Sequence, residues 1–419
     1  MAAGGNPLRN NRDFRLLWIG QTVSVLGSRI SAIAFPLLVL AVWRSPARAG
    51  IVGFANSIPL LLLQIPAGAI VDRWNRKRTM IWSDLIRAAT LLSIGLALWA
   101  GSLTFWHVTL VAFLDGAFFV IFNLAENAAI PKVVPPEQLP TALAQNEART
   151  RGSALAGGPL GGVLFGIGRA WPFVADAVSY VVSIFTLAAI KTRFREDTAP
   201  QHEPLVREVV EGFGWLWRQP FIRATSLLVA GGNFIFQALL LVVIVVATER
   251  GAAPAEVGLM LSFIGVGGLL GSFVAAWAQR HLSARTIIVG VNWAWAALLP
   301  LIALPIPWYA IGPVIGFMAF VGPTWNVLVS TYELSLIPDR LLGRVTSVIL
   351  MLAWGSIPLG SLVAGAALEW LDQAPAVLSL AGMMAVVAII ATFSPAVRHA
   401  PALPEPTPMR EPEPVPART

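Results

Sequence analysis

The chain has 419 residues, of which 56% are hydrophobic and only 12% are charged. A soluble domain has about 25% charged residues, so a soluble protein of this composition would leave much apolar surface facing water. The absence of cysteine excludes thiol chemistry, disulfides and cysteine-based metal sites, and the four scattered histidines give no metal spacing. The net charge of +7 does not indicate nucleic-acid binding, because the basic residues are spread over short loops.

Apolar stretches long enough to cross a bilayer recur along the chain. They predict an all-α membrane protein of twelve transmembrane helices. The expected helices cover roughly residues 14–42, 48–71, 79–100, 105–131, 139–168, 171–191, 221–248, 255–279, 285–304, 308–332, 341–370 and 374–396. Turn-forming residues such as Pro135-Pro136 and Pro305 to Pro307 separate neighbouring stretches.

The chain divides into two similar halves of six helices. Arg73 matches Arg280 and Arg78 matches Arg285 at the same offset of 207 positions, which indicates a parallel pseudo-repeat around a central cavity. The expected units are an N-terminal segment 1–13, a first half 14–191, a linker 192–220, a second half 221–397 and a Pro-rich, disordered tail 398–419.

The linker and the loops indicate how the protein lies in the membrane. Apolar residues recur at helical spacing between Leu205 and Trp217, which predicts an amphipathic helix on the membrane surface. Most of the 29 Lys and Arg residues fall on the side of the N-terminus, so both termini are expected in the cytoplasm. Only four basic residues are expected in loops on the other side: Arg44, Arg48, Arg169 and Arg250.

The loop after the second helix combines a glycine, an Asp-Arg pair and a basic cluster. Its residues are Gly68, Asp72, Arg73, Arg76, Lys77 and Arg78. This pattern resembles the signature loop of the major facilitator superfamily. Gly68 is expected to allow close helix approach, Asp72 to lie at the positive end of a neighbouring helix, and the basic cluster to hold the loop at an anionic leaflet. The alternative is an ordinary positive-inside loop.

The fifth helix contains a glycine-proline segment with Gly158, Pro159, Gly161 and Gly162. It is similar to the motif of superfamily exporters that exchange substrate for protons, although one residue rather than two separates the proline from the glycine pair. The alternative is a small-residue packing face. The following segment, Trp171 to Tyr180, looks like a bacterial branch that contains siderophore exporters and macrolide or multidrug efflux proteins. The resemblance implies a multi-pass protein of the bacterial cytoplasmic (inner) membrane.

Charged residues inside membrane helices are costly and are functional candidates. Nearly all of them lie in the first half, and the proton-coupling candidates are Arg29, Asp115, Glu126, Glu147, Arg149 and Arg151. Arg29 and Asp115 are expected to face each other across the cavity, either for proton coupling or as a static ion pair. Glu126 is expected to bridge Arg149 or Arg151, as a gate, a proton relay or a structural bridge.

Three further charges are interpreted as structural. Asp84 and Arg87 lie one turn apart at the start of the third helix, and Asp176 lies near the outer end of the sixth. The second half offers neutral polar groups instead of charges. The substrate-cavity candidates are Asn233, Gln237 and Asn326, for which interhelical hydrogen bonds are the alternative role.

The sequence therefore predicts a proton-coupled antiporter that exports a bulky amphipathic molecule, such as a drug, macrolide or siderophore, by alternating access. An importer or lipid flippase of the same fold is the alternative, and a non-transporting receptor or enzyme is a second one. The sequence shows no set of nucleophile, base and orienting group, so an enzyme is not expected. The expected partners are the substrate, protons and the lipid bilayer, but not nucleic acid. We expect a monomer that uses the proton gradient and no cofactor.

Overall fold

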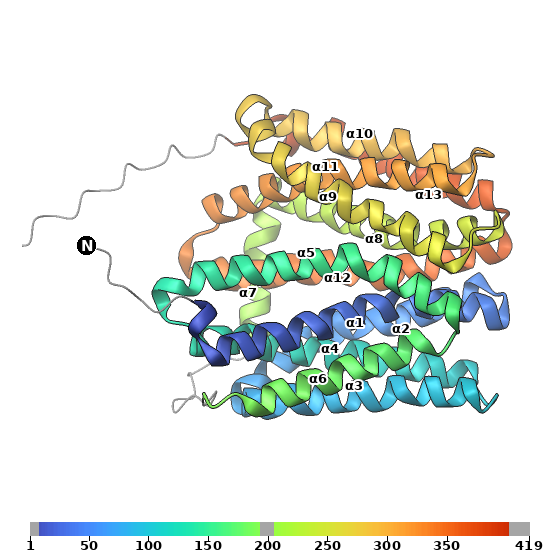
Figure 1. Cartoon of the computed structure of the whole chain (residues 1–419). Helices are drawn as coiled ribbons and strands as arrows, with labels where there is room; N and C mark the ends of the chain where they lie inside the picture. Colours follow the sequence, from blue (N-terminus) through green and yellow to red (C-terminus); the bar gives the residue numbers. More distant parts are fainter. Residues whose placement is uncertain (1–7, 193–204, 402–419) are drawn as a thin grey trace, which may run out of the picture.

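The computed structural model describes residues 8–192 and 205–401, and this part of the chain is a bundle of helices (Figure 1). The first six long helices are α1 (Arg12–Trp43), α2 (Pro46–Arg73), α3 (Arg76–Trp99), α4 (Phe105–Val133), α5 (Leu139–Ile167) and α6 (Trp171–Ala189). The second six are α8 (Pro220–Glu249), α9 (Pro254–His281), α10 (Ala284–Ala303), α11 (Trp308–Leu336), α12 (Asp339–Trp370) and α13 (Gln373–Phe393). Two short helices are α7 (Leu205–Arg218) and α14 (Pro395–Arg398).

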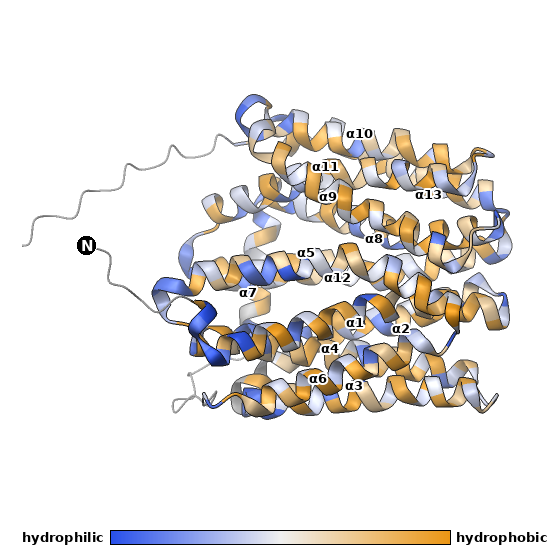
Figure 2. Cartoon of the chain, in the orientation of Figure 1, coloured by the Kyte–Doolittle hydropathy of each residue, from blue (hydrophilic) through white to orange (hydrophobic). Residues whose placement is uncertain are grey.

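Every predicted transmembrane segment is an α-helix. Within the described residues, eleven helices are long and apolar enough to cross a membrane. The remaining long helix, α5, carries Glu147, Arg149 and Arg151 in its first half but packs between α1 and α9 inside the bundle. Figure 2 shows hydrophobic colour along the helix bodies and hydrophilic colour concentrated at their ends. The prediction of a twelve-helix, all-α membrane protein is therefore confirmed.

Local sequence signals explain where several helices begin. The side chains of Asn11, Asn75 and Thr104 accept hydrogen bonds from the backbone N–H three residues later, which caps α1, α3 and α4. Proline occupies the first position of α2, α8 and α9, where its missing N–H costs nothing. These caps and prolines mark where six of the long helices begin.

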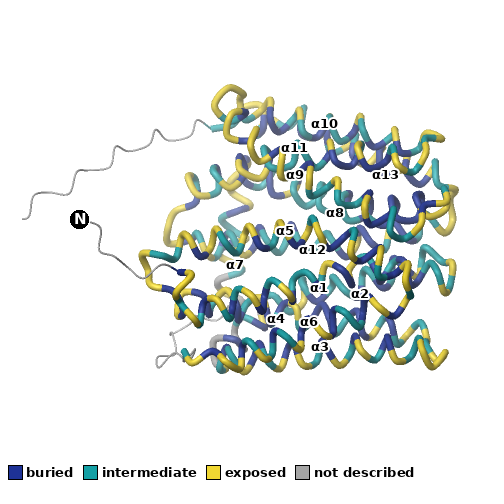
Figure 3. The backbone as a smooth tube through the Cα atoms, viewed as in Figure 1, coloured by how far each residue is buried: buried dark blue, intermediate teal, exposed yellow. Residues whose placement is uncertain are grey.

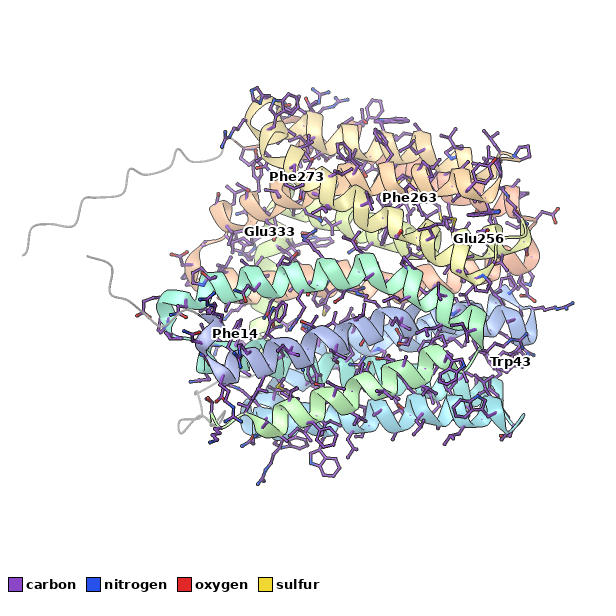
Figure 4. The ribbon with its side chains drawn as sticks, viewed as in Figure 1. Phe14, Trp43, Glu256, Phe263, Phe273 and Glu333 are labelled. Atoms are coloured by element: carbon purple, nitrogen blue, oxygen red, sulfur yellow. The ribbon has the colours of Figure 1, made fainter. Side chains whose placement is uncertain are left out.

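The bundle has two ends, which we name by the chain termini. Phe14 of α1 and Glu333 of α11 lie toward the termini face, whereas Trp43 and Glu256 lie toward the far face (Figure 4). Helix α7 packs against α12 and α8, and a Cβ at Gly212 would lie 2.6 Å from the carbonyl oxygen of Arg344. Its Val210, Phe213 and Trp217 side chains are exposed, as expected for an amphipathic helix lying on a membrane surface.

Among the described residues, the buried cluster that contains both halves lies toward the far face. One buried cluster contains residues of both halves, including Leu38, Val52, Val242 and Val257. Toward the termini face, the first half has a cluster of its own around Phe14, and the second half has a separate cluster. Figure 3 shows buried and exposed residues alternating along the helices, with exposed residues also at the loops of both ends.

Glycines form the seam where the halves meet. Helix α2 packs against α12, and a Cβ at Gly50 would lie 2.9 Å from the Cα of Gly365. Helix α5 packs against α9, and a Cβ at Gly158 would lie 2.9 Å from the carbonyl oxygen of Gly258. Gly162 is crowded in the same way by Pro254. Without these glycines the helix backbones could not approach so closely.

The seam ends near the middle of the bundle. The last close approaches are Leu155 to Gly265 between α5 and α9, and Leu61 to Gly355 between α2 and α12. Closer to the termini face, a Cβ at Gly68, Gly152, Gly268 or Gly343 would meet no heavy atom within 4 Å among the described residues. The role expected of Gly68 stays a prediction, because several side chains beside it lie outside the described part of the chain.

A polar contact reinforces the seam at the far face. The Glu369 carboxylate of α12 accepts a hydrogen bond from the Ser45 hydroxyl at 2.8 Å and one from the backbone N–H of Ala47 at 3.0 Å. The second bond places an anion from one half at the N-terminus of α2 in the other half, where the helix dipole favours it.

Widening the glycine seam should open the far face. In Gly162→Leu, the new side chain would overlap the Pro254 backbone, so we expect a longer distance between spin labels placed on the exposed residues Arg48 and Asp372. Because the chain has no cysteine, the two label sites can be introduced as the only thiols. Gly166→Leu on the same helix is the control, since a Cβ there meets nothing within 4 Å. Equal distances in both variants would contradict the proposed role of the seam.

Candidate functional site

A buried ion pair lies at the centre of the first half. The Arg87 Nε of α3 donates to the Asp115 Oδ1 of α4 at 2.9 Å. The two side chains are only 4% and 10% exposed. A buried pair of this kind persists only when further hydrogen bonds satisfy both partners, because removing two charges from water is expensive.

Three more helices supply those bonds. Asn56 of α2 donates to the other Asp115 oxygen at 3.3 Å, and Tyr180 of α6 donates to Oδ1 at 3.5 Å. The Arg87 guanidinium donates to the Ser28 hydroxyl of α1 at 3.4 Å and lies 4.3 Å from the centre of the Tyr180 ring. The Ser28 and Tyr180 hydroxyls are 2.9 Å apart. The pair thus connects α1, α2, α3, α4 and α6 in one polar network.

Two additional carboxylates lie beside this network and are fully buried. The Ser31 hydroxyl of α1 lies 2.5 Å from one Asp176 carboxyl oxygen of α6, and the Ser179 hydroxyl lies 3.1 Å from the other. Neither oxygen of Asp84 makes a geometrically acceptable hydrogen bond among the described residues.

Arg29 is not the partner of Asp115, contrary to the prediction. With about 3.6 residues per turn, Arg29 lies on the side of α1 opposite Gly20, Gly27 and Ser31, which pack against α6. Its Cβ packs against Gly157 of α5, and its side chain is exposed. The predicted Arg29–Asp115 pair was wrong because the positions of the two residues along their helices do not tell which face of α1 meets α4.

The predicted bridge between α4 and α5 is present. Arg149 donates to Glu126 at 2.9 Å, and both side chains are buried. The alternative partner, Arg151, instead pairs with Glu147 one turn away on the same helix. Both members of that second pair are more than half exposed, so it contributes little to stability.

The signature loop binds neighbouring helix ends. Arg76 is buried and donates to the Ala128 carbonyl of α4 at 3.1 Å. Lys77 donates to the carbonyl oxygens of Ala188 and Ile190 at the end of α6. These two cations thus stabilise helix C-termini, whereas Arg78 is exposed. The side chains of Asp72 and Arg73 are outside the described part, so their expected roles stay predictions.

The glycine-proline segment packs on two sides. A Cβ at Gly157 or Gly161 would collide with α1, at Arg29 and Ile30. A Cβ at Gly158 or Gly162 would collide with α9 of the other half. The segment is therefore a packing face, and Pro159 lies between its two sides within α5.

The amide candidates of the second half differ in their surroundings. Asn233 donates to the Ala353 carbonyl at 2.9 Å and Gln237 to the Ser361 hydroxyl at 3.1 Å, and both bonds connect α8 to α12. Asn326 of α11 is exposed and makes no hydrogen bond with the described residues. The side-chain amide of Asn326 thus differs from the other two in having no partner among the described residues.

Several residues of the site were missed or misread from the sequence. Asp84, Arg87 and Asp176 were expected to be structural charges near the membrane surface, yet all three are buried in the bundle. Arg87 rather than Arg29 pairs with Asp115. Asn56 and Tyr180 were not singled out, although a polar side chain in an apolar helix signals a buried hydrogen bond.

The family model described as transmembrane secretion effector, a group of the major facilitator superfamily, matches residues 2–415. The chain belongs to this family. The predicted superfamily membership is confirmed, and the family consists of membrane transporters rather than enzymes.

Curated relatives of the chain are efflux proteins. The chain is 28% identical over 393 residues to the multidrug efflux pump Tap of Mycolicibacterium fortuitum, covering 89% of this chain and 93% of the pump. It is 24% identical to Tap of Mycobacterium tuberculosis, covering 92% and 94% of the two chains. It is 23% identical to macrolide efflux protein A of Streptococcus pyogenes, covering 68% and 73%.

Solved structures support the fold. A bacterial homologue of the iron transporter ferroportin in the inward-facing state has a TM-score of 0.71 and 15% identity, covering 91% of this chain and 99% of that one. A bacterial homologue of the lysosomal transporter Spinster, inward-facing and unoccupied, has a TM-score of 0.68 and 15% identity, covering 94% and 97%. The chain is therefore a multi-pass membrane transporter of the major facilitator fold.

Breaking the Arg87–Asp115 pair from one side should destabilise the protein. Arg87→Met leaves Asp115 buried without its cation, which typically costs about 3–5 kcal/mol. The double variant Arg87→Met, Asp115→Leu should recover much of this loss, because no unpaired charge remains at the pair. Chemical unfolding in detergent, followed by tryptophan fluorescence, measures both changes. A double variant as unstable as the single one would contradict a role in charge compensation.

Exchanging Glu126 and Arg149 should show whether this ion pair only joins two helices or also takes part in proton transfer. Glu126→Arg alone should abolish transport, because it places two arginines together. Glu126→Arg with Arg149→Glu should restore transport if the bridge only joins α4 to α5. Uptake into vesicles that contain folded protein is the measurement, and failure of the exchange would assign Glu126 a chemical role.

Proposed function

We propose that this transporter is a proton-coupled antiporter that exports bulky amphipathic molecules by alternating access. The efflux relatives support the substrate class. The first-half network supports the coupling, because it places buried ionisable groups where five helices of that half meet. We further propose that it acts as a monomer without a cofactor and uses the proton gradient, in the inner membrane of a bacterium.

The loop charges support an orientation with both termini in the cytoplasm. The seam at the far face would then close the outer side, and the parted termini face would open to the cytoplasm. An exporter takes up its substrate from this side. Arg29 and Asn326 are accessible in this conformation, so they are the side chains we assign to substrate contact.

The observation that carries the coupling proposal is the position of Asp115 between α3 and α2. Its Oδ1 binds Arg87, while its Oδ2 accepts from Asn56. Asn56 also donates to the Ala112 carbonyl, and Gly116 packs against the Asn56 backbone. A proton on Asp115 would weaken the bond to Arg87 and change how α4 packs on α2. Because α2 forms the seam with α12, protonation would then reach the contact between the halves.

An importer or lipid flippase would use the same fold, and it would differ in the direction of transport or in having a lipid-like substrate. The buried carboxylates of the first half are compatible with each of these alternatives, so they do not decide the direction of transport. The efflux relatives favour export over both alternatives.

Transport by purified protein in proteoliposomes tests the proposal. With an imposed pH gradient, we expect flux of at least one compound from a panel of macrolides, cationic dyes and a siderophore. Asp115→Asn should reduce this flux to the level of empty liposomes and leave gradient-independent exchange measurable. Flux that is unchanged in Asp115→Asn, with the same pH dependence, would remove Asp115 from coupling. Flux without any gradient dependence would refute the antiport mechanism.

A further inference from the structure

The buried groups around Arg87 contain more carboxylates than cations. Arg87 faces Asp115 from α4 and Asp176 from α6, while Asp84 lies one turn away on α3. The buried Arg149 is already engaged by Glu126. One arginine therefore serves up to three carboxylates, and a cluster inside a membrane cannot retain two uncompensated negative charges.

Asp115 is the carboxylate that Arg87 neutralises. It receives the direct bond from Arg87 at 2.9 Å and two further donors, from Asn56 and Tyr180. All of its close partners donate, which suits an ionised carboxylate. The remaining charge must therefore be removed at Asp176 and Asp84.

The hydrogen atoms around Asp176 can be counted. The Ser31 hydroxyl lies 2.5 Å from Asp176 Oδ2 and 3.2 Å from the Ser28 carbonyl, but it has only one hydrogen to donate. The Ser179 hydroxyl lies 2.7 Å from the Asp176 carbonyl and 3.1 Å from its side chain. If Asp176 carries a proton, it can donate to Ser31, and Ser31 can donate to the Ser28 carbonyl. Asp176, Ser31 and the Ser28 carbonyl then each have a hydrogen-bond partner.

The close side-chain partners of Asp176 among the described residues are hydroxyl groups. The groups that face it are the hydroxyls of α1, Arg87 and Asp84 from α3, Asp115 from α4, and Tyr180 from its own helix. No salt bridge joins Asp176 to a described cation. The close partner of Asp176 is thus a hydroxyl, whereas that of Asp115 is the guanidinium.

We propose that Asp176 is a proton-binding site in this conformation and that Asp176 and Asp115 share the charge of Arg87. When Asp115 takes a proton from water, Arg87 loses its counter-ion. Asp176 then releases its own proton to water and becomes the carboxylate that compensates Arg87. One proton is bound and one is released, so the cluster keeps the same charge. This inference rests on the coupling proposed above, to which it adds a second proton site on α6.

Infrared spectroscopy of the purified full-length protein tests the assignment without substrate or gradient. At neutral pH, the wild type should show the carbonyl stretch of a protonated carboxyl group, and Asp176→Asn should remove a component of this band. Asp115→Asn should also remove it, although Asp176 is intact, because Asp176 must then ionise to compensate Arg87. Asp372→Asn, at an exposed carboxylate on the far face, is the control and should leave the band unchanged.

Ser31→Ala provides a second test that does not depend on the folding of Asp176→Asn. Loss of the hydroxyl at 2.5 Å should shift the frequency of the band while keeping its intensity. An unchanged band in both Asp176→Asn and Ser31→Ala would overturn the proton site. Persistence of the Asp176 component in Asp115→Asn would overturn the sharing of Arg87. Loss of the band in both aspartate variants, together with no gradient-driven flux in proteoliposomes, would refute the proposed antiport and leave the proton site standing.

Discussion

The bond between Arg87 and Asp115 constrains the first half more than any other contact. A charged side chain inside a membrane bundle must be paired and surrounded by donors and acceptors. Arg87 and Asp115 meet this requirement only if α1, α2 and α6 each present a polar group at the same depth, which Ser28, Asn56 and Tyr180 do. The positions of five helices relative to one another are therefore linked to the ionisation of a single pair.

The same network reaches the contact between the halves through α2. One side of α2 packs on α4 at Asn56 and Gly116, and the helix meets α12 at Gly50. The far-face seam depends on backbone contact between glycines, which tolerates very little displacement. A small movement of α2 at Asn56 would therefore open or close the approach to Gly365. Helix α2 therefore takes part both in the polar network of the first half and in the glycine contacts between the halves.

The fold could be predicted from the sequence because apolar length is a property of each segment alone. The glycine-proline segment was also recognisable as a packing face. The ion-pair partners of the charged residues could not be predicted in the same way, since they depend on which faces of two helices meet. Asp115 was identified as a candidate, but Arg87 and Asp176 were placed near the membrane surface by counting from the loops.

The unequal distribution of charge gives the two halves different roles. In the second half, Asn233 and Gln237 connect α8 to α12 through neutral hydrogen bonds, whose strength does not change when a proton binds or leaves. In the first half, the corresponding contacts between helices include ion pairs, so their strength depends on protonation. A change in proton occupancy would alter the packing of α2 and α4 while the second half keeps its shape. The seam would then open because the helix packing of the first half changes while that of the second half stays nearly constant. In this way, proton binding to one half could drive a movement of the two halves relative to each other.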